Sequence, residues 1–312
     1  MNRLIENINR LKKTNNFSKL KVVSIGQDIY FRKTSLDSET KDFIGKFIPY
    51  TFFKDWSEQL SKIKEESPHI ILIYRPEVFD PKFLELLKKE FITIGYFTEP
   101  LPFNEYSDHP DLLNRYSFIK NFNFELCDFY VFYNPETTKV LNTLCEPILT
   151  HPLPVNDLVY ENRFEIQTDK VRGLFLGRVS EYRNTFLIPL KHYWDWTVID
   201  HGMDQIPFES NFNLGLNLHS ENYPNFENRI FLQMAQGLVV LSQKTIPAFG
   251  LKNNKHYFEF ENPEELLSKV NDLSHDLESI KNIRDKAFKF VEDYKASVFW
   301  NSLLRKLEKK IK

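Results

Sequence analysis

Short apolar runs alternate with amphipathic segments along the first half of the chain. Strand-like runs occupy 21–25, 69–74, 91–97 and 129–133, and helix-like segments occupy 55–65, 81–90 and the stretch that follows Asn134-Pro135. The apolar runs lack the strict alternation of a half-exposed sheet, and helices stand between them. This pattern predicts a parallel sheet that is covered by helices on both faces.

The pattern stops at 151–157 (HPLPVND) and then restarts. Predicted strands follow at 171–176, 196–200, 212–218, 238–242 and 257–260, with helices at 226–236, from Asn262-Pro263 onward, and over the tail from about 280 to 312. We therefore expect an α/β protein with two Rossmann-like domains, 1–152 and 153–290, and a C-terminal helix, 291–312, that packs back on the first. Such domains face each other across a cleft, where ligands bind.

The composition excludes several classes of protein. A chain of 312 residues that is 42% hydrophobic is long enough for two cores. The formal net charge of −2 argues against a nucleic-acid partner. Cys127 and Cys145 form no C-x-x-C pair, and neither a signal peptide nor a membrane-spanning run is present. We expect a cytoplasmic protein.

The first thirteen residues form an amphipathic pattern, with Leu4, Ile5, Ile8 and Leu11 on one helical face and basic residues elsewhere. Packing on its own domain is the interpretation we favour. Peripheral contact with the inner face of a membrane is the alternative.

Missing motifs narrow the chemistry. The chain has no P-loop sequence and no G-x-G-x-x-G, which argues against nucleoside-triphosphate hydrolysis and against NAD or FAD as cofactor. No D-x-D pair is present to hold Mn²⁺ on a nucleotide sugar. If a diphosphate is bound, we expect arginines and helix N-termini to neutralise it without a metal.

Two segments carry candidate binding residues. In 175–183 (FLGRVSEYR) a predicted strand delivers Gly177, followed by Arg178 and Arg183. Glycine permits close backbone approach, and two guanidiniums can engage a diphosphate; surface ion pairs are the alternative. In 218–231 a polar stretch leads into a predicted helix, whose N-terminal end would favour an anion.

The candidates in that second segment are Asn225, Glu227, Asn228 and Arg229. For Glu227 the alternative is simple placement at the positive end of a helix, and for Arg229 an ion pair. Glu99 follows the predicted strand at 91–97 and is a candidate base on the acceptor side, or else a loop carboxylate with local hydrogen bonds.

These segments resemble the group 1 glycosyltransferases of the GT-B fold, and within them the branch of spore-maturation-type (CgeB-like) enzymes. The resemblance rests on FLGRVSEYR, on NRIFLQMAQGLVVLS and on the capped helix near 262, and it covers about 146–310. It implies that Gly177, Arg178 and Arg183 bind the diphosphate of a nucleotide-sugar donor. It also implies a glycan or lipid-linked acceptor.

The chain departs from that family at one point. Many members carry two glutamates eight residues apart, but the corresponding positions here are Pro224 and Leu232. The nearest carboxylates are Glu221 and Glu227, so Glu221 joins Glu99 as a candidate catalytic carboxylate. The sequence thus predicts a metal-independent glycosyltransferase without a cofactor. A sugar-nucleotide epimerase of the same architecture and a non-catalytic glycan- or nucleotide-binding subunit remain open.

Overall fold

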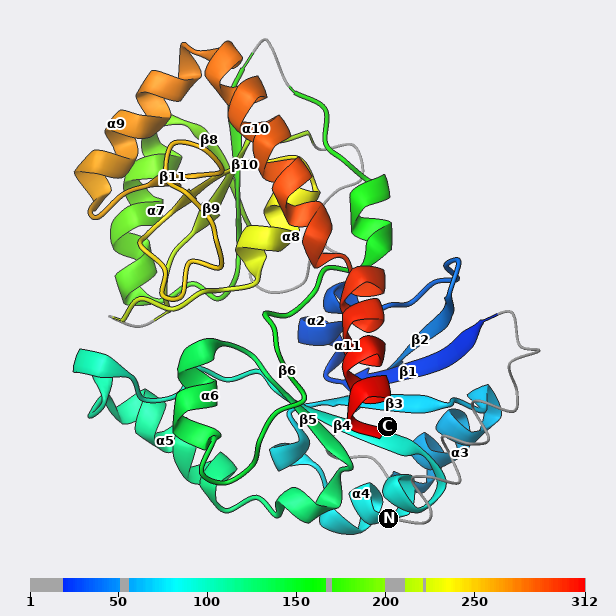
Figure 1. Ribbon diagram of the computed structural model, residues 1–312. Helices are drawn as coiled ribbons and strands as arrows, with labels where there is room; N and C mark the ends of the chain where they lie inside the picture. Colours follow the sequence, from blue (N-terminus) through cyan, green and yellow to red (C-terminus); the bar gives the residue numbers. More distant parts are fainter. Residues whose placement is uncertain (1–18, 51–55, 167–169, 200–210, 221–222, 312) are drawn as a thin grey trace. The chain divides into compact units, whose positions relative to one another are not determined.

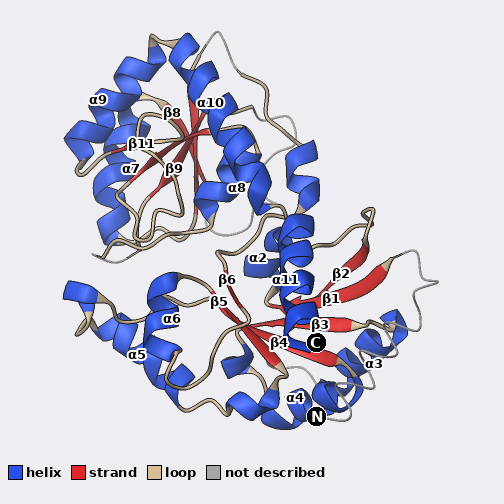
Figure 2. Ribbon diagram, in the orientation of Figure 1, coloured by secondary structure: helices blue, strands red, loops and turns tan. Residues whose placement is uncertain are grey.

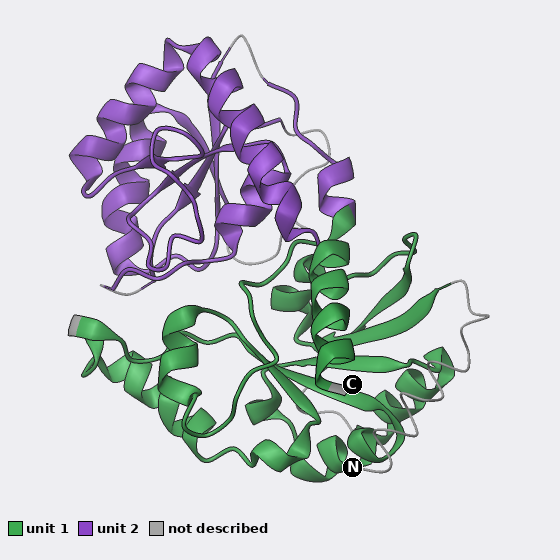
Figure 3. Cartoon of the chain, viewed as in Figure 1, with its two compact units in different colours: residues 1–157, 296–312 green, residues 158–295 purple. Residues whose placement is uncertain are grey.

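The computed structural model describes residues 19–50, 56–166, 170–199, 211–220 and 223–311. The chain divides into two compact units (Figure 3). Unit 1 contains 1–157 and 296–312, and unit 2 contains 158–295. The sequence placed these boundaries at 152/153 and 290/291, five residues earlier in each case. Each unit is built on one parallel sheet, so the α/β class and the two Rossmann-like domains are confirmed.

Unit 1 has a six-stranded sheet in the order β2-β1-β3-β4-β5-β6, and all of its strands are parallel. The strands are β1 (Leu20–Gly26), β2 (Phe43–Pro49), β3 (Ile70–Tyr74), β4 (Ile92–Phe97), β5 (Phe129–Phe132) and β6 (Leu149–Thr150). Every residue of β3 and β4 is buried, as expected for central strands with helices on both faces.

The helices of unit 1 are α2 (Asp28–Phe31), α3 (Trp56–Glu66), α4 (Pro81–Glu90), α5 (Pro110–Lys120), α6 (Pro135–Leu141) and α11 (Ala296–Ile311) (Figure 1). Two of them, α4 and α6, begin at side-chain caps that are visible in the sequence. The Asp80 carboxylate accepts a hydrogen bond from the Lys82 N–H at the start of α4, and the Asn134 side chain accepts one from the Thr137 N–H at the start of α6. These caps satisfy N–H groups that lack a partner inside the helix.

Helix α11 belongs to unit 1 although it ends the chain. The Phe299 ring stacks on Tyr96 with centroids 5.8 Å apart, and Trp300 lies 6.3 Å from Phe43. The Asp157 carboxylate accepts a hydrogen bond of 3.0 Å from the Ser297 N–H. Aromatic burial and this polar anchor attach the end of the chain to the first sheet.

Unit 2 has a five-stranded parallel sheet in the order β11-β10-β9-β7-β8. Its strands are β7 (Arg172–Leu176), β8 (Asp195–Ile199), β9 (Leu214–Asn217), β10 (Val239–Ser242) and β11 (Phe258–Glu259). Its helices are α7 (Glu181–Tyr193), α8 (Arg229–Ala235), α9 (Pro263–Ser274) and α10 (Leu277–Val291), and they lie on both sides of the strands (Figure 2).

The structure corrects the expected elements in several places. Strands β2 and β6 and helices α2, α5 and α7 were not predicted. The helical tail is two helices, α10 and α11, separated by a 3-10 turn at Glu292–Tyr294. Strand β2 lies at the edge of its sheet with Ile44 and Lys46 exposed, so its apolar signal is short. The amphipathic segment 1–13 lies outside the described residues. None of the helices in the described part of the chain has the length and apolar character needed to cross a bilayer.

Candidate functional site

The carboxyl ends of β7 and β9 form a topological switch point in unit 2. From β7 the chain moves to β8 on one side, and it then returns to place β9 on the other side. In open α/β sheets, ligands bind at such points, outside the carboxyl ends of the strands. Gly177 and Arg178 follow β7, while Leu218 and His219 follow β9, so both polar segments singled out in the sequence meet at this edge.

Gly177 occupies a position that only glycine fits. Its φ is +143°, a backbone conformation that side chains disfavour, and a Cβ built there would lie 2.6 Å from Nη1 of Arg229. Its N–H donates to the Ile199 carbonyl at 2.9 Å, which fixes the turn at the end of β7. The missing side chain therefore makes room for the Arg229 guanidinium against the main chain at the switch point.

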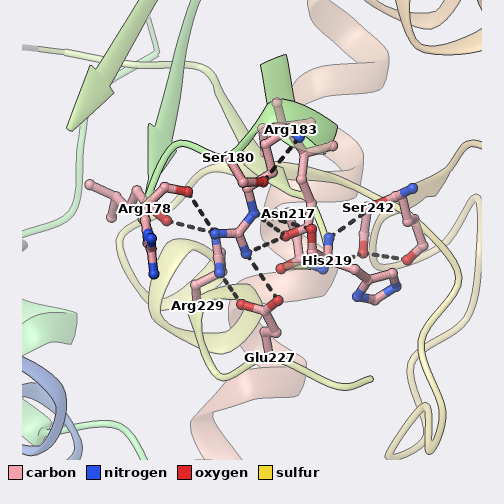
Figure 4. A network of polar contacts seen from close by, with 12 residues as sticks. Arg178, Ser180, Arg183, Asn217, His219, Glu227, Arg229 and Ser242 are labelled. Atoms are coloured by element: carbon pink, nitrogen blue, oxygen red, sulfur yellow. Dashed lines mark hydrogen bonds and ion pairs between the residues drawn. The ribbon is translucent and has the colours of Figure 1, made fainter. Parts of the chain in front are cut away.

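The side chain of Arg178 is exposed, and it has no hydrogen-bond or ion-pair partner within the described ranges. Figure 4 shows its guanidinium directed away from the surrounding polar groups. Its carbonyl, in contrast, is fixed by a hydrogen bond of 2.8 Å from Nη1 of Arg183. The backbone of Arg178 is therefore fixed, while its guanidinium remains accessible to a ligand.

Arg183 is buried, with 3% of its surface exposed. Its Nε donates to the carbonyls of Leu218 and His219, at 3.1 Å each, and its Nη2 donates to Leu218 at 2.7 Å. The guanidinium therefore joins the chain after β7 to the chain after β9. The alternative of a surface ion pair does not describe it, because the partners are mainly backbone carbonyls.

Glu227 lies between two guanidiniums. One carboxylate oxygen accepts from Nη2 of Arg183 at 3.3 Å, and the other pairs with Nη2 of Arg229. Nη1 of Arg229 also donates to the Leu176 carbonyl at the end of β7, at 2.7 Å. Both guanidiniums lie beside the Phe175 ring, 5.5 and 5.4 Å from its centroid. We call Arg183, Glu227 and Arg229 the arginine–glutamate cluster (Figure 4).

The electrostatics of this cluster explain why a carboxylate lies inside it. Burial, and then the nearby Arg183 charge, lower the pKa of Arg229 well below its usual value. Two buried like charges repel in a low dielectric, and an unpaired buried charge is costly. The Glu227 carboxylate offsets this repulsion because it pairs with both guanidiniums.

His219 and Asn217 add unpartnered acceptors next to the cluster. Nε2 of His219 lies 2.7 Å from the Lys244 carbonyl, so Nε2 carries the proton, and the buried Nδ1 has no hydrogen-bond partner among the residues that the structure describes. Burial, together with the charges of Arg229 and Arg183, lowers the pKa of His219 to about 4, although the hydrogen bond to the Lys244 carbonyl acts in the opposite direction. The imidazole is therefore neutral at pH 7. Oδ1 of Asn217 is likewise buried and unpartnered.

The remaining predicted donor residues lie on an irregular stretch. The predicted helix at 226–236 begins three residues later, at Arg229, and its seven residues end at Ala235. Asn225 and Glu227 thus precede the helix, and Asn228 is its N-cap residue without a side-chain cap bond. The fully buried Phe226 packs on Phe231 and Phe249, with centroids 4.6 and 4.8 Å apart, and this packing holds the segment out of the helix. Glu221 lies outside the described residues.

Glu99 lies in unit 1, after β4. Its carboxylate pairs with Nε of Arg75 at 3.1 Å and with Nη1 of Arg115. Arg75 also pairs at 3.1 Å with Glu77, whose second oxygen is buried without a partner, and burial raises the pKa of that carboxyl. Glu99 is thus part of an ion-pair network at the carboxyl ends of β3 and β4, with partners that are distant in the sequence.

Sequence reasoning missed two members of the site. Phe175 was assigned only to a strand, because nothing in an apolar run indicates which ring will lie beside a guanidinium. A single histidine in a sequence is usually hydrogen-bonded and carries no sign of a role, so the unpartnered Nδ1 of His219 becomes visible only once Lys244 is placed beside Nε2. Within the described part of the chain, no three His, Cys, Asp or Glu side chains are arranged to hold a metal ion.

Comparison with known proteins identifies the architecture. No protein-family model and no curated protein matches the sequence. Among solved structures, HepE from Anabaena in complex with UDP-glucose is similar over 93% of this chain and 100% of its own, with 10% identity and a TM-score of 0.57. A glycosyltransferase from Rickettsia africae is similar over 95% and 99%, with 13% identity and a TM-score of 0.55. Sucrose-phosphate synthase from Thermosynechococcus elongatus is similar over 98% and 92%, with 11% identity and a TM-score of 0.54. At these identities the likeness concerns the fold, and the fold is GT-B.

Proposed function

We propose that the protein is a glycosyltransferase that takes its sugar from a nucleotide-sugar donor, and that unit 2 binds this donor. The observation that carries the proposal is the exposed guanidinium of Arg178, which has no partner among the described residues and follows Gly177 at the switch point of the second sheet. A guanidinium can donate two parallel hydrogen bonds to phosphate oxygens. Gly177 in turn lets a second guanidinium, that of Arg229, lie against the main chain at the same edge. The similar structure of HepE contains UDP-glucose, which supports the same class of donor here.

In this proposal each residue of the site has a separate role. Arg178 binds the diphosphate and stabilises the charge that develops on it as the sugar leaves. Arg183 acts through the backbone, because it fixes the Arg178 carbonyl and the chain after β9. Arg229 contacts the Leu176 carbonyl beneath Gly177 and lies where a diphosphate oxygen could reach it.

We also propose that the reaction needs neither a divalent metal nor a cofactor, and that unit 1 binds a glycan or lipid-linked acceptor in the cytoplasm or at the inner face of the membrane. The absence of a D-x-D pair in the sequence and the presence of arginines at the switch point support metal independence. Turnover that survives EDTA is the expected result. Complete loss of turnover that added Mg²⁺ or Mn²⁺ restores would contradict this part.

A thermal-shift screen of UDP, GDP, CMP and TDP sugars tests the proposed function. A donor at about 100 times its Kd should add roughly 2.7 kcal/mol to the free energy of unfolding. The stabilising donor is then incubated with and without candidate acceptors and analysed by mass spectrometry. Transfer to an acceptor is expected. A changed sugar at unchanged mass without an acceptor would indicate an epimerase, and binding without turnover at any acceptor would indicate a binding subunit.

A further inference from the structure

Glu227 places a negative charge inside a site that we propose binds an anionic diphosphate. Its side chain is 18% exposed and lies between the guanidiniums of Arg183, 4% exposed, and Arg229, 13% exposed. An anionic ligand at the switch point is attracted by these arginines and repelled by Glu227. The repulsion acts in a partly buried region, where a charge is weakly screened by solvent.

The ligand's charge increases during the proposed reaction. The bond between the anomeric carbon and the terminal phosphate oxygen breaks, and its electron pair stays on that oxygen. The acceptor oxygen forms the new bond to carbon, and the acceptor's proton passes to solvent. The diphosphate thus changes from two negative charges, in the nucleotide sugar, to about three in the free nucleoside diphosphate above the second phosphate pKa of about 6.

We propose that Glu227 sets the selectivity of the site between donor and product, weakening the binding of the nucleoside diphosphate more than that of the nucleotide sugar. This inference rests on the proposed function. Because Coulomb energy scales with the ligand's charge, one fixed carboxylate repels the product more strongly than the donor. Glu227 thereby promotes release of the product, and it also keeps Arg183 and Arg229 from repelling each other in the empty site.

A matched pair of variants separates this role from a general effect of charge. Glu227→Gln removes one negative charge and keeps the side chain's size. Glu181→Gln removes the same charge from the exposed first turn of α7, on the same stretch of chain as Arg178 and Arg183. Glu227→Asp keeps the charge and shortens the reach. Only the first variant should alter the balance between donor and product.

The experiment is calorimetric titration of UDP and UDP-glucose, or of GDP and its sugar if the wild type binds that pair, at pH 8 and low salt. The measured quantity is the ratio of the two dissociation constants. Glu227→Gln is expected to shift this ratio at least about fivefold toward the diphosphate, which is roughly 1 kcal/mol. Glu181→Gln and Glu227→Asp should stay within about twofold of wild type. In turnover, product inhibition should strengthen and kcat should fall. The KM for the donor should fall as well, because the carboxylate also repels the two negative charges of the donor.

The outcomes distinguish the inference from the proposed function. If the wild-type protein binds no nucleotide, both the proposed function and the inference about Glu227 are refuted. A wild type that binds both ligands, with an unchanged ratio in Glu227→Gln, or with both ligands weakened equally, overturns the inference alone. If Glu227→Gln is only marginally folded, UDP should raise its unfolding temperature more than it raises that of wild type. A variant that stays unfolded in saturating UDP assigns Glu227 to the fold and overturns the inference.

Discussion

Replacing Arg178 by alanine tests the donor site most directly. The side chain is exposed and has no partner within the described residues, so its removal should change the free energy of unfolding by no more than about 0.5 kcal/mol. The free energy of binding of a nucleoside diphosphate should fall by much more. A charge-assisted hydrogen bond contributes about 1.5–3 kcal/mol, and the guanidinium can form two with a diphosphate.

Because Arg178 is exposed, screening by solvent reduces this sum, and we expect a loss of about 2–3 kcal/mol. The dissociation constant for the nucleoside diphosphate should therefore rise roughly 30- to 150-fold. Arg178→Lys should recover part of the loss, because an ammonium supplies the charge without the planar fork. The assay is calorimetric titration next to the unfolding midpoint in urea, for the wild type and both variants.

Two results would refute the reasoning. If Arg178→Ala binds the nucleotide as tightly as the wild type, the diphosphate does not lie beside Gly177. If Arg178→Ala fails to fold, the side chain has a structural partner that the geometry does not show. A matched control is Arg172→Ala, since Arg172 lies at the opposite end of β7 and should leave nucleotide binding unchanged.

Three further outcomes follow from buried groups. Arg183→Ala should cost roughly 3–5 kcal/mol in the urea unfolding of the nucleotide-free protein, because it leaves Glu227 and several carbonyls without their donor; a loss below 1 kcal/mol would contradict the structural role. His219 has a pKa of about 4 in the fold and about 6.5 when unfolded, so the wild type should lose up to about 3 kcal/mol of stability relative to His219→Gln as the pH falls from 6.5 to 4; parallel curves would refute a neutral buried imidazole. The raised pKa of Glu77 implies that native protein loses stability as the pH rises above about 4.5, so the stability of Glu77→Gln relative to wild type should increase from pH 4.5 to 7; a decrease would show that the carboxylate is well solvated or paired.

Local signals in the sequence predicted much of the fold. The strands expected at 21–25, 69–74 and 91–97 are β1, β3 and β4, and Asn134 and Asn262 cap α6 and α9 as expected. Such features depend on neighbouring residues: an apolar run makes a buried strand, and a side-chain oxygen satisfies the N–H two or three positions on. Because these strands and caps depend only on residues close in the sequence, a short segment is enough to predict them.

The sequence also identified the two segments, 175–183 and 218–231, that form the candidate site. The sequence singled out Gly177 and the stretch after Leu218 separately. The structure brings them together, because β7 and β9 are neighbouring parallel strands that end at one edge of the sheet. Gly177 was chosen because a glycine at the end of a strand frees the backbone, and its φ of +143° agrees with that reason. The donor roles of these residues stay predictions.

Only the tertiary structure decided what each charged side chain does. Arg178 and Arg183 look equivalent in FLGRVSEYR. Yet the guanidinium of Arg178 is exposed, whereas that of Arg183 is buried against carbonyls that follow strand β9, about 35 residues away in the sequence. The same holds for Glu227, whose partners come from two different helices. Burial and pairing depend on which distant backbone atoms converge on a group, and no local pattern records that convergence. The sequence by itself therefore determined which residues stand at the switch point, and the fold determined which of them are free to bind a ligand.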